Sequence, residues 1–261
     1  MFFRKIMKQN MTQEPIVYQT GTYVKLINKA EYCKSIIADG KELIVTGNES
    51  GELIVPELKD PKVYITFKEG ITVFSDVFLG CTKLTSVPAN LFANHPNATS
   101  FSGAFLRCTA LTAIPEDLFA NNQAAENFAW LFYNCRKLES IPEKLFANCP
   151  AVTDFSSSFA ACKRLVSIPS ALFAHNPNVT DFSYAFSDCS FITSIPASLF
   201  DNNRKIEVFS GLFFQLYIIE RRITLYGSRG EKSTSVRNEN SILNSLKNPD
   251  CISGYSNIAP V

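Results

Sequence analysis

Hydrophobic side chains recur along the middle of the chain with a constant 27-residue period. Each unit begins with phenylalanine and carries a second phenylalanine at its fifth position. Cysteine follows at position 8, leucine or isoleucine at 11, an aliphatic residue and proline at 14 and 15, and Leu-Phe at 18 and 19. The first positions are Phe74, Phe101, Phe128, Phe155, Phe182 and Phe209. Five full units without a register slip are typical of stacked repeats.

Local signals predict a helix, a strand and a helical turn within each unit. Residues that favour helix N-caps precede four of the units, namely Ser100, Asn127, Asp154 and Asp181. Positions 1, 5 and 8 would share one face of a short helix. Positions 11 to 14 are apolar and precede proline, which favours an extended backbone, so we expect a short β-strand there. Proline at position 15 can open a second helical turn.

The phrase Ala-Phe-x-x-Cys-x-x-Leu-x-x-Ile-Pro occurs as AFLRCTALTAIP at residues 104–115 and, with Ile for Leu, as AFSDCSFITSIP at residues 185–196. It resembles the BspA-type leucine-rich repeats and related repeat proteins of gut bacteria and their phages. The resemblance covers about residues 73–213, and it implies a leucine-rich-repeat solenoid, often on cell-surface adhesins. The chain departs from the family in its longer unit and in lacking the apolar segment of a signal peptide.

We therefore predict an α/β fold, a right-handed leucine-rich-repeat-like solenoid over residues 73–213. Each 27-residue rung would hold one short parallel β-strand and short helices. Strands of successive rungs would pair about 4.8 Å apart, and parallel crossovers are right-handed. The stack would bury collectively the apolar faces that no single rung can bury.

The residues before the repeat predict a small β-rich cap or attachment domain at 16–72, after a disordered segment at 1–15. Strands are expected at 22–27, 42–46, 52–56 and 62–67. Residues 28–40 read as one short helix, with Asn28 and Glu31 in a capping-box relation and Gly40 as its stop.

The repeat stops within its sixth unit, after Phe209 and Phe213. Residues 214–261 contain no Cys, Leu, Ile-Pro or Leu-Phe in phase. Two explanations stay open. If the reading frame is shifted by one base, codons allowed for residues 214–219 can encode Phe-Asn-Cys-Thr-Ser-Leu, which has cysteine and leucine in phase with the repeat. On this explanation the tail is a frameshift product. The polar composition also suits a genuine disordered tail.

Composition limits the partners. The chain has 261 residues and a net charge of +1, which argues against a general polyanion binder, so we expect no nucleic acid. No apolar run has the length of a membrane span. The resemblance implies a cell-surface or virion location, but the N-terminal residues show no signal-peptide pattern, which weakens the expectation of a surface adhesin, so the location stays unknown.

Five cysteines occupy position 8 and would stack as a ladder: Cys81, Cys108, Cys135, Cys162 and Cys189. A disulfide is possible by distance, but stacked side chains point the same way and their number is odd. A metal needs converging thiolates, which a linear ladder does not offer. We therefore expect each cysteine to be a small buried core residue.

Three surfaces are candidates for binding. The strand face at positions 12 and 13 is small and hydroxylated, and includes Thr112, Glu139 and Thr193. A broken basic stripe comprises Lys83, Arg107, Arg136, Lys137, Lys163 and Arg164. Trp130 and Tyr184 share position 3 and could stack on a sugar. The alternatives are a solvated face, a solubilising edge and aromatic rings that only cover a helix edge.

No catalytic constellation is visible. The GxSxG, HExxH and DxDxDG patterns are absent, and His95 and His175 lie three rungs apart. We expect no enzyme, metal or cofactor. The predicted function is a non-catalytic binding or adhesion module that recognises a protein or glycan through a repeat surface. The alternative is a structural or receptor-binding component of a phage.

Overall fold

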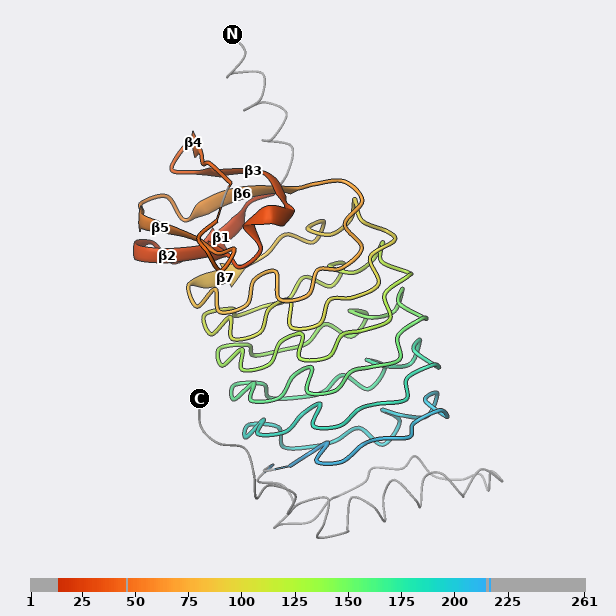
Figure 1. Cartoon of the computed structure of the whole chain (residues 1–261). Coiled ribbons are helices and arrows are strands. Elements are labelled where there is room, and N and C mark those ends of the chain that lie inside the picture. Colours follow the sequence, from red (N-terminus) through yellow and green to blue (C-terminus); the bar gives the residue numbers. More distant parts are fainter. Residues whose placement is uncertain (1–13, 46, 215, 217–261) are drawn as a thin grey trace, which may run out of the picture.

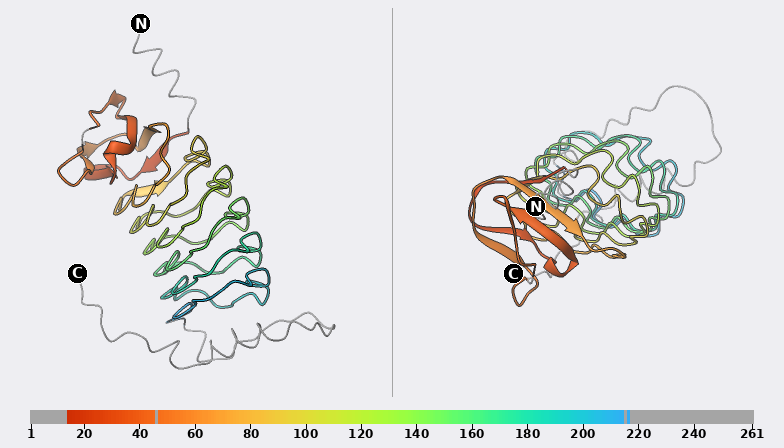
Figure 2. Two further views of the ribbon diagram at one scale, coloured as in Figure 1. Left: turned by 45° about the vertical axis from the view of Figure 1, so that its right-hand side comes forward. Right: turned by 90° about the horizontal axis from the view of Figure 1, so that it is seen from above.

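The computed structural model describes residues 14–45, 47–214 and 216 (Figure 1). The predicted disordered N-terminus and the predicted tail lie outside these residues, except for residues 14, 15, 214 and 216. The described chain forms a β-rich unit followed by a stack of rungs (Figure 2).

The N-terminal unit consists of two antiparallel sheets. The five-stranded sheet has the order β4-β3-β6-β1-β7, and β2 pairs with β5 in the second sheet. The strands are β1 (Ile16–Tyr18), β2 (Gly21–Ile27), β3 (Cys33–Ala38), β4 (Lys41–Glu42), β5 (Leu53–Leu58), β6 (Lys62–Phe67) and β7 (Leu84–Ser86). The strands predicted at 22–27, 52–56 and 62–67 are confirmed as β2, β5 and β6, whereas only residue 42 of the predicted 42–46 strand is extended, in β4.

The helix predicted at residues 28–40 is wrong. Only the 3-10 turn η1 (Ala30–Tyr32) is helical there, and β3 follows it directly. Ile36 and Ile37 of β3 are buried and pair with Ile65 and Tyr64 of β6, so burial of β-branched residues in a sheet outweighs the local helix signals. Asn28 does not cap a helix, because its side chain donates to the main-chain oxygen of Asp76.

The N-terminal unit covers the first rung. The ring of Phe67 lies 5.1 Å from that of Phe74, and Tyr18 is fully buried. The main-chain N–H of Asn28 donates to the oxygen of Val77 at 2.9 Å. Strand β7 belongs to the first rung and pairs with β1, so the unit and the first rung share one sheet.

Rungs are joined by main-chain hydrogen bonds at every second residue of positions 1 to 7. In the second rung, Phe101 donates to Asn127 at 2.9 Å, Gly103 to Ala129 at 2.8 Å and Phe105 to Leu131 at 2.9 Å. The same pattern occurs in each of the first five rungs. Parallel bridges join the residues that precede position 1, which are Val73, Ser100, Asn127, Asp154, Asp181 and Val208.

The N–H groups at positions 4, 6 and 8 bond within their own rung. Ala104 donates to Phe101 at 3.0 Å, and Cys108 donates to Phe105 at 3.1 Å. This alternation requires a left-handed backbone at positions 3 and 7. Among the residues with φ near +60° are Asp76, Gly103, Trp130, Ser157, Tyr184 and Gly211 at position 3, and Arg107, Asn134, Ala161 and Asp188 at position 7.

The residues predicted as helix N-caps do accept a hydrogen bond from a nearby main-chain N–H, but this N–H belongs to a turn and not to a helix. From the second to the fifth rung, the side chain before position 1 accepts from the N–H of position 2, as Asp154 does from Ser156 at 2.7 Å. In these rungs every N–H of positions 1 to 7 is therefore satisfied, and none is left for an α-helix.

The predicted α/β architecture, a right-handed leucine-rich-repeat-like solenoid with short helices and one parallel strand per rung, is therefore wrong. The described residues contain no α-helix, and their named strands all pair antiparallel. Positions 1 to 8 form successive turns instead of a helix. Positions 11 to 13 form a strand only in β7, which pairs with β1. From the second to the fourth rung, a single long main-chain bond joins each rung to the one before at these positions, such as Glu139 to Thr112 at 3.4 Å.

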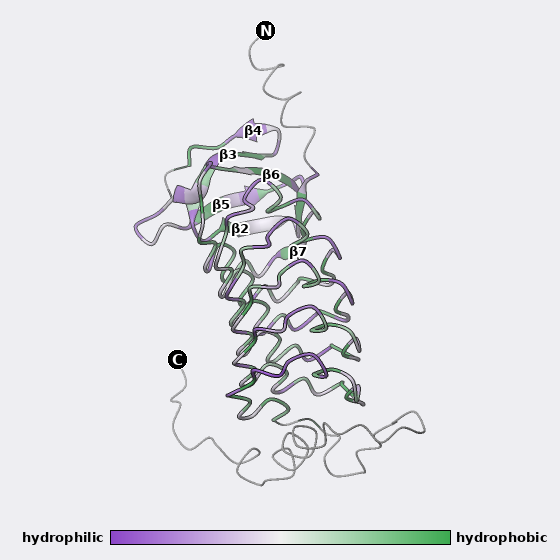
Figure 3. Ribbon diagram, turned by 90° about the vertical axis from the view of Figure 1, so that its right-hand side faces the viewer, coloured by the Kyte–Doolittle hydropathy of each residue, from purple (hydrophilic) through white to green (hydrophobic). Residues whose placement is uncertain are grey.

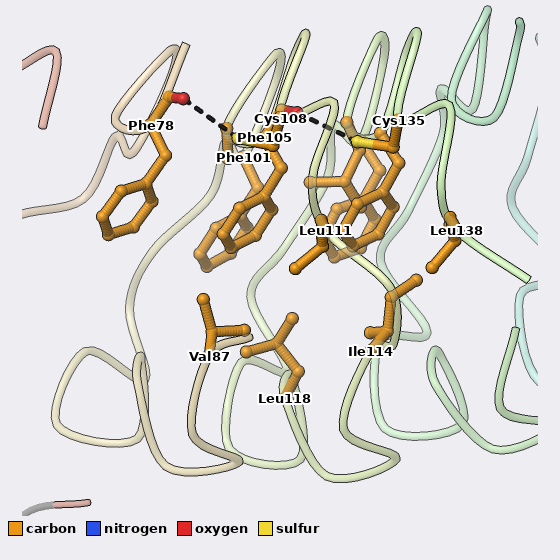
Figure 4. Close-up of a cluster of buried hydrophobic side chains, with 14 of the residues drawn as sticks. Phe78, Val87, Phe101, Phe105, Cys108, Leu111, Ile114, Leu118, Cys135 and Leu138 are labelled. Carbon is orange, nitrogen blue, oxygen red and sulfur yellow. Dashed lines mark hydrogen bonds between the residues drawn. The ribbon is translucent and has the colours of Figure 1, made fainter. Parts of the chain in front are cut away.

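Phenylalanine columns fill the interior of the stack (Figure 4). At position 5, the rings of Phe78 and Phe105 lie 5.4 Å apart at an interplanar angle of 5°, and those of Phe105 and Phe132 lie 5.3 Å apart at 6°. The columns at positions 1 and 19 pack against each other, as Phe101 does against Phe119 at 4.9 Å. Apolar and polar stretches alternate along each rung (Figure 3).

Candidate binding surfaces of the repeat

The position-8 cysteines form a ladder of thiol hydrogen bonds. From the second rung on, each sulfur donates to the main-chain oxygen at position 5 of the rung before, as from Cys108 to Phe78 at 3.2 Å and from Cys135 to Phe105 at 3.2 Å (Figure 4). Cys162 and Cys189 continue the series. All seven described cysteines are buried and free. Each ladder thiol therefore fills the core and, from Cys108 on, also links two rungs.

Burial keeps these thiols protonated. It raises the pKa of Cys81 to about 12, and it raises the pKa of Cys108, Cys162 and Cys189 well above the usual range. The thiolate is the reactive form of cysteine. The ladder is therefore closed to reagents both sterically and chemically.

We expect the native ladder to resist a thiol reagent at pH 8. In a Cys251→Ser variant, which removes the one cysteine outside the described residues, labelling should be at least about 100-fold slower than for a small free thiol. After denaturant is added, the remaining seven cysteines should become accessible to the reagent together. Mass spectrometry after timed quenching measures this. Rapid labelling of any position-8 cysteine in the native protein contradicts the burial.

A second ladder, at position 22, was missed by the sequence reasoning. Asn176 donates through Nδ2 to the main-chain oxygens of Phe146 at 3.0 Å and Cys149 at 2.8 Å in the preceding rung. Asn122 and Asn203 make the equivalent bonds. The sequence contains a signal for it, since asparagine recurs at this position in three of five units. These side chains are structural, because all three are buried.

Most of the basic stripe is engaged within the molecule. Lys163 pairs with Asp188 of the next rung at 3.1 Å, and Arg164 pairs with Glu139 of the preceding rung at 3.5 Å. Arg136 donates to Asn134, and Lys83 donates to the main-chain oxygen of Thr22. Within the described chain, only the Arg107 and Lys137 side chains of the stripe make no hydrogen bond or ion pair. Two of the six cations, Lys163 and Arg164, are therefore paired with carboxylates, and Arg136 and Lys83 are held by uncharged acceptors.

The face at positions 12 and 13 is exposed and uneven. Main-chain bonds align Thr112 with Glu139, and Glu139 with Val166. Val166 is half exposed, and the carboxylate of Glu139 forms an ion pair with Arg164. Thr193 is exposed in the fifth rung. The column therefore mixes a hydroxyl, an ion pair and an apolar side chain.

The aromatic residues of position 3 lie on the repeat's most regular segment. Trp130 and Tyr184 at position 3, together with Tyr133 at position 6 beside Trp130, are called the aromatic column. Trp130 is 43% exposed, and its ring lies 5.0 Å from that of Tyr133 at an angle of 48°. The Tyr184 ring lies over Gly211 of the next rung and leaves no room there for a Cβ. Large residues at position 3 thus alternate with small ones. Ser157 occupies the rung between Trp130 and Tyr184, and Gly103 and Gly211 occupy the rungs on either side of the pair.

Within the described residues, no three histidine, cysteine or acidic side chains are close enough to share a metal ion. His95 is buried against Phe67 and Phe74, and burial lowers its pKa, while His175 is exposed. The described part of the chain also contains no helix that is long and apolar enough to cross a membrane.

No protein-family model matches this chain, and no curated protein matches it. The resemblance to BspA-type repeats therefore stays a prediction from the motif alone.

Proposed function

We propose that the chain is a non-catalytic binding or adhesion module that recognises a glycan through the aromatic column. The observation that carries the proposal is Trp130. This large aromatic residue is 43% exposed although it occupies a backbone conformation, φ 59°, that costs bulky side chains about 1–2 kcal/mol. The stacking imposes this backbone at position 3 of every rung, so the distinguishing feature of Trp130 is a large aromatic ring that is left exposed there.

The chemistry of the column suits a sugar. An aromatic face carries negative charge density, and the C–H face of a pyranose presents weakly positive hydrogens to it. The segment beneath Trp130 and Tyr184 is held by hydrogen bonds on every N–H, so little ordering is needed on binding. Tyr133 braces Trp130 from the same rung.

A protein ligand is the competing outcome, since tryptophan and tyrosine also anchor protein interfaces. A structural or receptor-binding role in a phage would use the same surface, and detection of the chain in purified virions would favour that role.

The Trp130→Gly and Tyr184→Gly variants test the proposal. Glycine is the residue that the repeat itself uses at position 3 in Gly103 and Gly211, so both variants should keep the fold. We expect the parent chain to bind members of a glycan array, and Trp130→Gly to weaken the best interaction at least tenfold, which is about 1.4 kcal/mol. Calorimetric titration measures the change.

Lys137→Glu is the matched control, because Lys137 is exposed, lies outside the column and makes no ion pair within the described chain. Its binding should equal that of the parent chain. An array without any glycan signal, or equal binding by Trp130→Gly, contradicts the proposal. A strong loss in Lys137→Glu would point to the basic stripe instead.

A further inference from the structure

The last described rung ends in a row of main-chain donors that have no acceptor among the described residues. In each of the first five rungs, the N–H groups at positions 1, 3 and 5 donate to the next rung, as Phe182 does to Val208, Tyr184 to Ser210 and Phe186 to Leu212. In the sixth rung these positions are Phe209, Gly211 and Phe213. Their N–H groups have no acceptor anywhere in the described chain.

Some apolar side chains at this end are incompletely covered, whereas Phe213 and Leu216 are buried. Phe173 and Phe182 are fully buried in the interior, whereas their equivalents Phe200 and Phe209 are only partly buried. Ile195 is likewise partly exposed, although its counterparts in the four preceding rungs are buried. Apolar side chains and main-chain donors therefore lie on one face, which we call the end face.

The rung-to-rung hydrogen bonds made by side chains also stop here. In each of the first four rungs, two main-chain oxygens accept hydrogen bonds from side chains of the next rung. The oxygen of position 5 accepts from a cysteine thiol, and the oxygen of position 19 accepts from the side chain of position 22. The last donors in the two series are Cys189 and Asn203. At the next position 8 the chain has Leu216, whose side chain cannot donate a hydrogen bond. Within the described chain, the oxygens of Phe200 and Asn203 thus lack the amide that Asn203 itself supplies to Phe173 and Asn176.

We infer that the end face is a docking surface for a rung of the same 27-residue pattern supplied by another polypeptide. The surface continues an interface that the structure already contains five times. A docking rung must offer main-chain oxygens at alternate residues, phenylalanines in phase with Phe209 and Phe213, and a thiol and an amide for the two ladders.

The polarity of the end face identifies the partner's docking end. The end face offers donors, so the partner must present acceptors, which are the oxygens of an uncovered first rung. A second copy of this chain does not offer them, because Asn28 and Phe67 of its N-terminal unit already cover that end. Two copies placed end face to end face would set donors against donors. Residues 217–261 do not contain the pattern.

Hydrogen exchange on the full chain tests the inference, with a synthetic polypeptide of residues 154–207 as the probe. This probe contains two rungs, both ladder residue types and no N-terminal unit. Without the probe, the N–H groups of Phe209, Gly211 and Phe213 should exchange at least about 100-fold faster than those of Phe182, Tyr184 and Phe186. The probe should slow the first set at least tenfold, saturably.

Two matched pairs control the experiment. A probe that carries Phe155→Ser and Phe159→Ser should give no protection. On the chain, Ile195→Lys places a charge on the end face and should abolish the effect, whereas Val166→Lys, which is exposed away from that face, should preserve it.

Three results overturn the inference. Protection of the three N–H groups in the monomeric chain alone means that its own C-terminal residues occupy the edge. Protection that follows a concentration-dependent dimer in light scattering means that a second copy does. Fast exchange that the probe leaves unchanged means that the end face does not dock a rung.

Discussion

Phe159→Ala is expected to lower the free energy of unfolding by about 3–5 kcal/mol, the range for removing a fully buried aromatic ring. Phe159 is 0% exposed and lies in the middle of the position-5 column. Its ring stacks on Phe132 at 5.6 Å and on Phe186 at 5.5 Å. Because the hydrogen-bonded segments on both sides hold the rungs at a fixed spacing, the stack cannot collapse into the space. Urea denaturation followed by circular dichroism measures the change.

Phe213→Ala is the matched control. Phe213 occupies the same position in the last described rung and stacks on Phe186 alone among the described residues, at 5.9 Å. A substitution there removes one stacking partner and opens no gap between two rungs, so the loss should be smaller. A loss below about 1 kcal/mol for Phe159→Ala would show that the column is not the core of the repeat.

Asn176→Asp should be about as damaging, although it changes only one functional group. The amide of Asn176 donates to two buried main-chain oxygens, and its Oδ1 atom has no partner within the described chain. A carboxylate there would lose both donated bonds and place negative charge beside two oxygens. Full burial raises the pKa of a carboxyl by up to about 3–5 units, so the loss at pH 7 should be roughly 4–7 kcal/mol.

The pH dependence of this loss has a definite sign. The introduced carboxyl should have a folded-state pKa above its unfolded value of about 3.9. Relative to the parent chain, the deficit should therefore be smallest near pH 4 and grow as the pH rises toward 7. Asn178→Asp, on the exposed side of the same turn, should cost no more than about 1 kcal/mol at any of these pH values. A deficit independent of pH would mean that position 176 is open to water.

The strands β2, β5 and β6 were predictable because alternating apolar residues and flanking turn signals agree with the sheet that forms. Strand β3 was not, because Asn28, Glu31 and Gly40 imitate helix boundaries. Only the pairing with β6, which follows β4 and β5 along the chain, makes the extended form favourable.

The candidate surfaces show the same division. The sequence placed Lys163 and Arg164 side by side on a basic stripe, yet their partners Asp188 and Glu139 lie one rung away in opposite directions. It also placed Trp130 and Tyr184 at one position of the unit. That position has a left-handed backbone, with Gly211 beneath Tyr184, and only the structure revealed this.

The sequence by itself determined the interval of the repeat and the side chains that occupy equivalent positions, because a 27-residue period is a property of the residue order. The tertiary structure alone decided the backbone path within a rung. Alternate N–H groups of positions 1 to 7 find their acceptors in the next rung, almost one full repeat further along the chain. Local propensities depend only on residues close in sequence and take no account of such a distant acceptor. They therefore favour a helix where stacking produces turns.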